Sequence, residues 1–325
     1  MDTYNEQSRL LSPREAKARF EGVDVDLWRR LETVFPVRIT RSWADRMRRS
    51  DGPLGRQAVP VDAELESFED DVVDPVGEEA RMPHPLIVQK HPDRLLMLVT
   101  RRCHLHCRYC FRRDLDGAGD PSDEELEDAI AFAKASGVRE VILSGGDPLV
   151  LRNARLSHIL SSLRPSIPQL RIHTRAPITF PERVDDDLIN LLQSHAPLWM
   201  VVHCNHPDEL SPDVSQALTR MVDAGIPVLN QSVLLRGVND NVEALAGLSE
   251  RLLALRVKPY YLHHPDAVVG GAAFRVSIED GLALHRALRS RVSGLGLPAY
   301  VIDPPDGTGK VPVAEWVTNS VPSRP

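Results

Sequence analysis

Lysine and cysteine are both scarce in this chain of 325 residues, of which 42% are hydrophobic. Only five of its 39 basic residues are lysines, and it has only four cysteines. The chain is long enough to bury a full core, so it is not a small scaffold that depends on disulfides. Its length fits either roughly two domains or one α/β barrel.

A basic excess and long apolar runs are absent as well. The 39 Lys and Arg against 46 Asp and Glu give a net charge of −7, which offers no attraction for a phosphate backbone. No apolar run approaches the roughly 20 residues of a membrane span. The N-terminus, MDTYNEQSRLL, is polar and charged, unlike a signal peptide. We therefore expect a cytoplasmic protein with neither a nucleic-acid nor a membrane partner.

Residues 12–50 have the apolar spacing of helices. Residues 51–92 are rich in Pro, Gly, Asp and Glu, and we interpret them as an extended segment on the surface. Near Arg94 an alternation of β-type and helical runs begins. We divide the chain into 1–92 and 93–325. The predicted strands are Leu95–Thr100, Glu140–Leu143, Leu170–Thr174, Leu198–His203, Val228–Leu235, Lys258–His263 and Ala299–Ile302. The predicted helices between them are 122–136, 152–164, 184–195, 211–224, 241–256 and 277–291.

This alternation is typical of parallel βαβ units. It predicts an α/β fold, a barrel or partial barrel whose site lies at the carboxyl ends of the strands. An open doubly wound sheet is the alternative. No G-x-G-x-x-G follows the first strand, which disfavours a dinucleotide-binding version.

Three cysteines, Cys103, Cys107 and Cys110, lie within eight residues directly after the first of these strands, with the spacing C-x3-C-x2-C. In a reducing compartment such crowding indicates metal or redox chemistry instead of disulfides. A structural zinc needs four ligands, and the fourth would have to be a nearby histidine or the distant Cys204. Three thiolates can instead hold three irons of a [4Fe–4S] cluster and leave the fourth iron open. We expect Cys204 to be buried without a ligand role.

The cysteine loop resembles that of the radical S-adenosylmethionine (SAM) superfamily, whose hallmark is this spacing after the first strand of a partial (β/α)6 barrel. The resemblance implies that the open iron binds SAM and that one-electron reduction cleaves SAM to a deoxyadenosyl radical. Ser144, Gly145, Gly146 and Asp147, at the end of the second strand, resemble the family's glycine-rich SAM-binding turn. Taken alone, this sequence would fit an ordinary turn.

Lys310 follows a glycine-rich stretch, Asp303-Pro-Pro-Asp-Gly-Thr-Gly, near the C-terminus. Taken alone it would be an exposed loop lysine, and it does not complete a phosphate-binding P-loop. From about residue 40 to 315, however, the chain resembles the lysine 2,3-aminomutase group of radical SAM enzymes. Further matching motifs are Arg175-Ala-Pro, His203-Cys-Asn-His-Pro, Asn230-Gln-Ser-Val-Leu-Leu-Arg-Gly and Lys258-Pro-Tyr-Tyr-Leu. The resemblance implies that Lys310 binds pyridoxal phosphate (PLP) as a Schiff base.

The same resemblance assigns roles to other residues. Arg112 would pair with the substrate carboxylate, a task that suits a bidentate guanidinium. Arg94 would lie near the PLP phosphate, in a run where His91 replaces the family's frequent tyrosine. His203 and Gln231 would line the cofactor region, although each also fits a buried core position.

Asp266 and Asp303 match the pair of aspartates that hold the side-chain ammonium of lysine in the lysine-specific enzymes. A buried cation needs opposite charge, so a cationic amino acid is the expected substrate. The resemblance implies an isomerase that moves the α-amino group of L-lysine from C2 to C3, with an electron donor such as flavodoxin or ferredoxin. We expect a homodimer.

Four alternatives remain at this point. A sister group makes (R)-β-lysine for elongation factor P, and Arg41-Ser-Trp-Ala-Asp-Arg-Met resembles that group. A mutase for another cationic amino acid is also compatible with the two aspartates. From other classes, a zinc-binding module and a non-radical PLP aminotransferase or racemase stay open; the latter has no use for three clustered thiolates.

Overall fold

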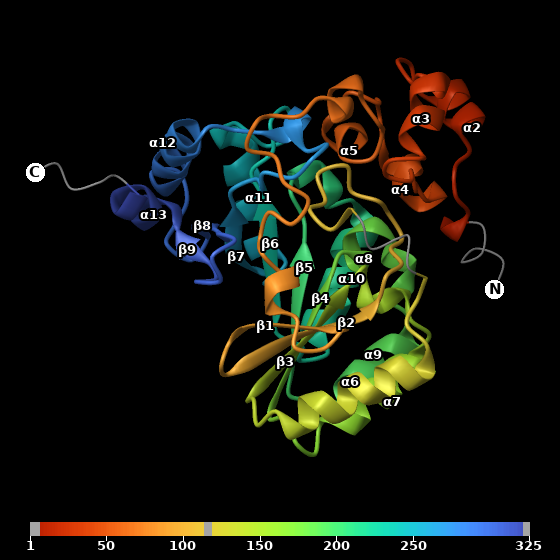
Figure 1. Cartoon of the computed structure of the whole chain (residues 1–325). Helices are drawn as coiled ribbons and strands as arrows, with labels where there is room; N and C mark the ends of the chain where they lie inside the picture. The colour runs from red at the N-terminus through yellow and green to blue at the C-terminus, as the bar shows by residue number, and fades with distance from the viewer. Residues whose placement is uncertain (1–6, 114–118, 321–325) are drawn as a thin grey trace, which may run out of the picture.

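A single nine-stranded sheet, whose strand order follows the chain order, organises the computed structural model, which describes residues 7–113 and 119–320 (Figure 1). Strands β2 to β8 are parallel, and β1 and β9 at the two edges are antiparallel to their neighbours. The strands are β1 (Ile87–His91), β2 (Arg94–Thr100), β3 (Glu140–Gly145), β4 (Gln169–Thr174), β5 (Leu198–His203), β6 (Val228–Val233), β7 (Lys258–His263), β8 (Ala299–Ile302) and β9 (Val311–Pro312).

Helices fill every crossover between the parallel strands, as such connections require. They lie outside the curved sheet in Figure 1. In order they are α6 (Asp123–Ala135), α7 (Asn153–Leu163), α8 (Ala176–Thr179), α9 (Asp186–Ser194), α10 (Pro212–Asp223), α11 (Val242–Ala254) and α12 (Ile278–Arg289), with α13 (Val313–Ser320) after β9. Short 3₁₀ turns occupy Asp62–Leu65, Glu79–Arg81, Pro148–Val150, Pro181–Arg183, Pro207–Glu209 and Ala272–Phe274. The partial-barrel prediction is confirmed.

Polar N-cap residues explain why these helices begin where they do. Ser122 accepts the backbone N–H of Glu125, whose carboxylate accepts the backbone N–H of Ser122 in return. Ser211 and Ser277 cap α10 and α12 through their hydroxyls. Each cap satisfies a backbone donor that the first helical turn leaves unpaired. These local signals are visible in the sequence, and all seven predicted strands and six predicted helices are present.

The structure also contains elements that we did not predict. Strand β1 lies inside the segment 51–92 that we interpreted as extended and on the surface, and β9 and α13 follow Lys310. Parts of that segment are buried: Gln57 is 0% exposed, and Glu64 forms an ion pair with Arg108 in which both side chains are 0% exposed. The interpretation of 51–92 as a surface segment was therefore wrong. Its polar composition is explained in part by such buried pairs.

The N-terminal helices pack over one end of the barrel (red and orange in Figure 1). Two tryptophans, Trp28 and Trp43, are completely buried there and join the main hydrophobic core. Burial of this large aromatic surface helps to hold the region on the barrel. The helices are α2 (Pro13–Arg19), α3 (Val25–Leu31), α4 (Arg41–Arg46) and α5 (Pro53–Arg56). The domain boundary at residue 92 stays a prediction.

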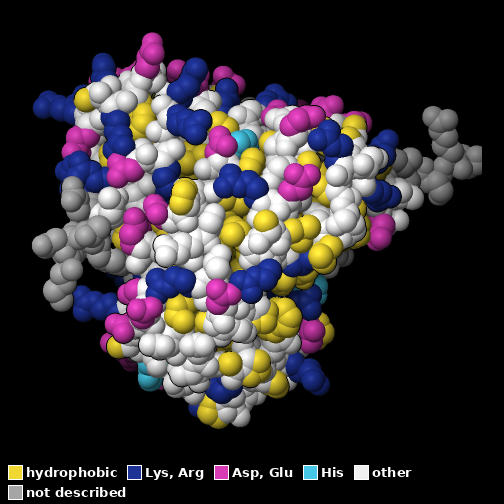
Figure 2. Space-filling model, turned by 180° about the vertical axis from the view of Figure 1, so that it is seen from behind, with side chains coloured by type: hydrophobic (Ala, Val, Ile, Leu, Met, Phe, Trp, Pro, Cys, Tyr) yellow, Lys and Arg dark blue, Asp and Glu magenta, His cyan; other side chains and the backbone are white. Residues whose placement is uncertain are grey.

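The outer surface mixes charges of both signs. On the face shown in Figure 2, Lys and Arg side chains are interspersed with Asp and Glu and with small apolar groups. Among the described residues, no helix combines the length and apolar character that a membrane crossing needs.

Candidate active site

A cavity of about 610 Å³ opens inside the barrel. It is lined by the cysteine loop, by side chains at the carboxyl ends of the parallel strands and by the loop that carries Lys310. All the residues to which the sequence assigned a site role lie on its wall: Arg94, Cys103, Cys107, Cys110, Arg112, Ser144, Gly145, Gly146, Asp147, His203, Gln231, Asp266, Asp303 and Lys310. The fold therefore brings together positions as far apart in the chain as Arg94 and Lys310.

The cysteine loop presents three thiols that form no disulfide, at Cys103, Cys107 and Cys110, each partly buried. Burial raises the pKa of Cys110 to about 11, and the neighbouring Cys107 adds to this effect. Such a thiol is proton-bearing in the protein alone and must lose its proton when it ligates a metal. The fourth cysteine, Cys204, is completely buried and does not line the cavity, as expected.

The N-terminal region fixes the shape of this loop. The backbone N–H of Arg108 donates to the carbonyl of Gln57 at 2.9 Å, and its guanidinium donates to Glu64 at 2.6 Å. His106 donates from its backbone to Arg38 at 3.0 Å. The three thiols are therefore held by contacts from residues 38–64, which the spacing of the cysteines does not reveal.

The glycine-rich turn lies directly against the chain that leads into Cys103. A Cβ on Gly145 would come within 2.3 Å of the Thr100 carbonyl, and one on Gly146 within 2.3 Å of the Arg102 carbonyl. Gly145 also has a φ of +115°, which side chains rarely allow. Only glycine permits this close approach, which places the turn beside the cysteine loop.

The carboxylate of Asp147, the last residue of this turn, already accepts hydrogen bonds from other residues of the protein. Its carboxylate accepts hydrogen bonds from the Thr174 hydroxyl at 2.5 Å and from the backbone N–H groups of Leu149 and Arg175 at 3.0 and 2.8 Å. It therefore connects the ends of β3 and β4. This contact pattern favours a structural task for Asp147, while Ser144 and the two glycines face the cavity.

His203 and Gln231 are direct neighbours on β5 and β6. The Nε2 atom of His203 lies 3.2 Å from the Tyr109 hydroxyl and 3.1 Å from the Asn205 side-chain oxygen. Burial lowers the pKa of His203 well below its usual range, with Arg175 adding to the effect, so the ring is neutral near pH 7. Tyr109 belongs to the cysteine loop, so His203 connects that loop to β5.

Asp303 is the centre of a charge cluster at the open edge of the barrel. Its carboxylate pairs with Lys90 of β1 at 2.9 Å and with Lys310 at 3.4 Å. Burial alone would raise the pKa of Asp303, but the two lysines outweigh it and hold the pKa below its usual range. The pairing connects the two ends of the sheet, because Lys90 lies on β1 and Asp303 directly follows β8.

Asp266 lies in the same cluster but has no side-chain partner among the described residues. Burial raises its pKa to about 7, and the negative charge of Asp303 adds to this effect against the opposing pull of Lys310 and Lys90. A buried carboxylate without a counter-ion is costly, so this group favours the arrival of a cation. It is the carboxylate in the described cavity best placed to receive one.

Arg112, the expected partner of a substrate carboxylate, is already paired. Glu78, on the segment before β1, accepts from its Nε at 2.7 Å and from its Nη2 at 2.5 Å, and both side chains are mostly buried. The Nη1 atom is left facing Ser144 at 3.4 Å. We did not predict Glu78 as a site residue, since no sequence motif marks it.

Basic and unpaired polar atoms near Lys310 fit an anionic cofactor. Arg94 pairs with the exposed Asp93 through its Nη1 atom, so the other nitrogens of its guanidinium can bind a ligand. His91 packs against Gly309, where a Cβ would come within 2.4 Å of its ring. On β4, the buried Nε2 of His173 lines the cavity without a hydrogen-bond partner. The guanidinium of Arg94, the orphaned imidazole nitrogen of His173 and the amine of Lys310 are compatible with PLP.

Three neighbouring thiols beside a glycine turn suit an iron–sulfur cluster and SAM. Within residues 7–113 and 119–320, no three His, Cys, Asp or Glu side chains converge in the way a single metal ion requires. The zinc-module alternative gains no support from this geometry.

Comparison with known proteins gives consistent results. Residues 97–248 match the family model of the radical SAM superfamily. The chain is 38% identical over 279 residues to the L-lysine 2,3-aminomutase of Fusobacterium nucleatum, covering 84% of this chain and 65% of that protein. It is 44% identical over 245 residues to a putative L-lysine 2,3-aminomutase of Treponema pallidum (74% and 69% covered). A glutamate 2,3-aminomutase of Clostridioides difficile is 35% identical over 266 residues, covering 80% and 63%.

Among solved structures, Streptococcus suis SuiB bound to S-adenosylmethionine matches with a TM-score of 0.51 at 16% identity, covering 66% of this chain and 51% of SuiB. At that identity the likeness supports the fold alone. The chain spans about 65% of the length of the F. nucleatum relative.

Proposed function

Because this chain belongs to the L-lysine 2,3-aminomutase family of the radical SAM superfamily, we propose that it is an isomerase that moves the α-amino group of L-lysine from C2 to C3 to give β-lysine. The cofactors of this family are a [4Fe–4S] cluster, SAM and PLP. When bound, the cluster and SAM supply a carbon radical that abstracts hydrogen, and PLP carries the amino group that moves.

We assign the cluster to Cys103, Cys107 and Cys110, whose thiols form no disulfide and lie on the cavity wall. Ser144, Gly145 and Gly146 would bind SAM through close backbone approach, and His203 and Gln231 would complete that wall. Lys310 would supply the amine that holds PLP, with Arg94 and Lys90 as counter-ions for its phosphate. The position of the cavity inside the barrel limits the access of water to reactive species.

The substrate would be held at its two ends. Arg112 would bind the α-carboxylate, while Asp266 and Asp303 would bind the side-chain ammonium. Within the protein, Asp303 already neutralises Lys90 and Lys310. It becomes available to a substrate ammonium when these amines take other partners, as both would with PLP in place.

The half-buried carboxylate of Asp266, which faces the cavity without a side-chain partner among the described residues, is the observation that carries the choice of lysine over glutamate. A glutamate side chain would add a third carboxylate beside those of Asp266 and Asp303, which costs energy in a site that is shielded from water. This matters because a glutamate 2,3-aminomutase is also among the relatives. A mutase for another cationic amino acid remains the nearest alternative substrate class.

The test is an anaerobic reconstitution with iron, sulfide, SAM, PLP and dithionite, followed by incubation with labelled lysine or labelled glutamate. We expect β-lysine from lysine and no β-glutamate. Failure with both substrates and with ornithine would remove the mutase proposal. The chirality of the β-lysine distinguishes a metabolic mutase from the type that serves elongation factor P.

Iron and acid-labile sulfide analysis separates a cluster enzyme from a zinc module. Cys103→Ala separates a radical enzyme, which would lose activity, from a PLP aminotransferase or racemase, which would keep it. The homodimer, the flavodoxin or ferredoxin donor and the cytoplasmic location stay predictions.

A further inference from the structure

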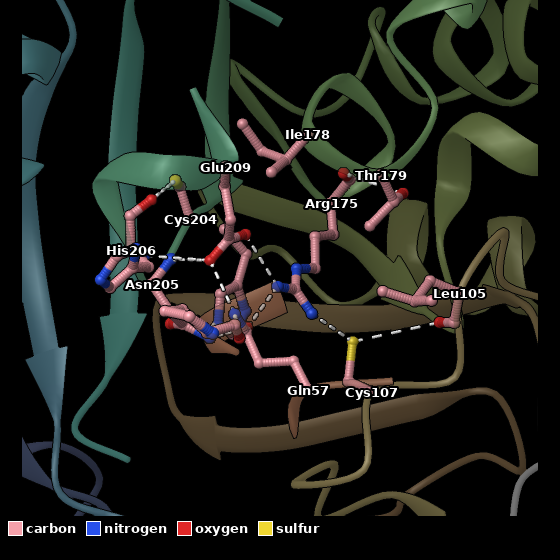
Figure 3. A network of polar contacts seen from close by, with 12 residues as sticks. Gln57, Leu105, Cys107, Arg175, Ile178, Thr179, Cys204, Asn205, His206 and Glu209 are labelled. Atoms are coloured by element: carbon pink, nitrogen blue, oxygen red, sulfur yellow. Dashed lines mark hydrogen bonds and ion pairs between the residues drawn. The ribbon is translucent and has the colours of Figure 1, made fainter. Parts of the chain in front are cut away.

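Arg175, the first residue after β4, contacts one of the three cysteines. Its Nη1 atom lies 2.7 Å from the Cys107 sulfur (Figure 3). The arginine is only 7% exposed, so water cannot easily replace this hydrogen bond. A guanidinium is permanently protonated in proteins, so a fixed positive charge faces that sulfur.

The opposite edge of the guanidinium is held by two buried acceptors. Its Nη2 atom donates to the Gln57 side-chain oxygen at 2.6 Å and to the Glu209 carboxylate at 2.9 Å. Figure 3 shows Arg175 between Glu209 on one side and Cys107 on the other. The carboxylate is therefore farther from the sulfur than the guanidinium is, and the positive end of this ion pair points at Cys107.

The acceptors are themselves fixed in place. The amide of Gln57 donates to Glu209 at 3.0 Å, and the Asn205 amide donates to the Gln57 oxygen at 2.9 Å. The carboxylate of Glu209 also accepts the backbone N–H groups of Asn205 and His206 at 3.0 and 2.9 Å. With every acceptor of this set satisfied, the guanidinium has one well-defined position.

The N-terminal region supplies part of this support. Gln57 directly follows α5, and the Trp43 ring of α4 lies 5.1 Å from the Arg175 guanidinium carbon. On another side the Tyr109 ring of the cysteine loop lies 5.4 Å away. Stacking on two aromatic faces adds cation–π attraction to the hydrogen bonds.

We propose that Arg175 is a positioning residue that donates a hydrogen bond to a ligand sulfur of the cluster and raises the cluster's reduction potential. This inference rests on the proposed function, because it requires a cluster on the three cysteines. Reduction takes one electron from a low-potential one-electron donor and moves no proton. A nearby positive charge and a hydrogen bond to sulfur stabilise the more negative, reduced form, and such outer contacts are known levers of cluster potential.

The experiment is an EPR-monitored redox titration without SAM, on protein whose iron and sulfide have been counted. For Arg175→Met we expect at least a tenfold lower ratio of reduced to oxidised cluster at a fixed potential, which equals a shift of about 59 mV for one electron. Arg175→Lys keeps the positive charge, so we expect a smaller shift of the reduction potential. Some shift should remain, because an ammonium does not reproduce the forked geometry with which the guanidinium reaches the sulfur and both acceptors. Gln57→Met removes one support and shifts the potential in the same direction.

Arg46→Met is the matched control. Arg46 is partly buried, lies 5.2 Å from the same Trp43 ring and donates to the carbonyls of Ile178 and Thr179, with no described contact to sulfur. Its loss should move the potential much less than the loss of Arg175.

An Arg175→Met protein with a complete cluster and the potential of the wild type would overturn the proposal, as would an equal shift in Arg46→Met. Changed SAM affinity at an unchanged potential would mean that Arg175 serves SAM and not the cluster. If Arg175→Met does not load a cluster, Arg175→Lys and Gln57→Met decide the matter in the same titration. A wild-type protein that binds no iron and sulfide would contradict the proposed function as well. A complete cluster whose potential does not change in the Arg175 variants would contradict this inference alone.

Discussion

The carboxylate of Glu78 makes two hydrogen bonds to the guanidinium of Arg112, at 2.7 Å to Nε and 2.5 Å to Nη2. The arginine that we assign to the substrate carboxylate therefore has an internal anion on its bidentate edge. Burial alone would lower the pKa of Arg112, but Glu78 outweighs it and raises the pKa. Substrate must share the guanidinium with Glu78 or displace it.

Glu78→Gln should lower the KM for lysine about three- to tenfold, because the incoming carboxylate no longer competes with a charged partner; a tenfold change corresponds to about 1.4 kcal/mol. The same variant should melt at a lower temperature without substrate, since it leaves the Arg112 charge without its partner. Steady-state kinetics and thermal melting with and without lysine measure both effects.

Glu79→Gln is the control, because Glu79 is exposed and has no described side-chain ion pair. It should leave KM and the melting temperature unchanged. A raised KM in Glu78→Gln would mean that Glu78 holds Arg112 in the orientation that the substrate needs.

Lys310→Ala should bind PLP without the absorbance band of a Schiff base. The amine of Lys310 faces the cavity, 6.0 Å from the Tyr261 ring and 3.4 Å from Asp303. Absorbance spectroscopy with a borohydride trap and peptide mapping measures the covalent bond. Lys134→Ala, which changes an exposed lysine of α6, should keep the band; a band that persists in Lys310→Ala would place the Schiff base elsewhere.

The pH profile for lysine should report Asp266. Its pKa is raised to about 7, so below this pH the carboxyl is neutral in the free protein and no longer attracts an ammonium. We expect kcat/KM to fall about tenfold per pH unit as the pH drops below about 7. The pKa of this carboxyl also depends on the neighbouring charges of Asp303, Lys310, Lys90 and Glu78. The fall in kcat/KM at acidic pH therefore reports the titration of this group of charges as a whole.

Asp266→Asn should remove this acidic limb and weaken lysine binding by roughly 2 kcal/mol or more, since the substrate ammonium loses a buried counter-charge. Norleucine has no side-chain ammonium, so its inhibition constant as a competitor of lysine should be the same in Asp266→Asn and in the wild type. An unchanged acidic limb in Asp266→Asn would assign it to another group.

Gly146→Ala should destabilise the protein by about 1–3 kcal/mol, because its Cβ would come within 2.3 Å of the Arg102 carbonyl. The displaced backbone lies directly before Cys103, so iron incorporation should fall as well. Denaturant unfolding and iron analysis measure these effects. Gly294→Ala is the matched control, since a Cβ there meets nothing within 4 Å; equal behaviour of the two variants would contradict the steric argument.

Much of the fold could be read from the sequence, since its signals are local. Strand β5 and strand β7 have the predicted bounds, Leu198–His203 and Lys258–His263, because apolar runs with nearby helix caps mark them. Strand β1 escaped prediction because its polar residues, among them Lys90, gave no alternation. Strand β9 has only two residues and exists because β8 offers an edge for pairing.

The sequence by itself determined the family, the α/β alternation, the cysteine spacing and the identity of the candidate site residues, because these are carried by short motifs. Only the tertiary structure decided the pairings of Glu78 with Arg112, of Lys90 with Asp303 and of Arg175 with Cys107, whose members are 34, 213 and 68 positions apart. No periodicity connects such residues. Their contacts arise when the curved sheet brings its edges and the N-terminal region around one cavity, where buried charges must find partners.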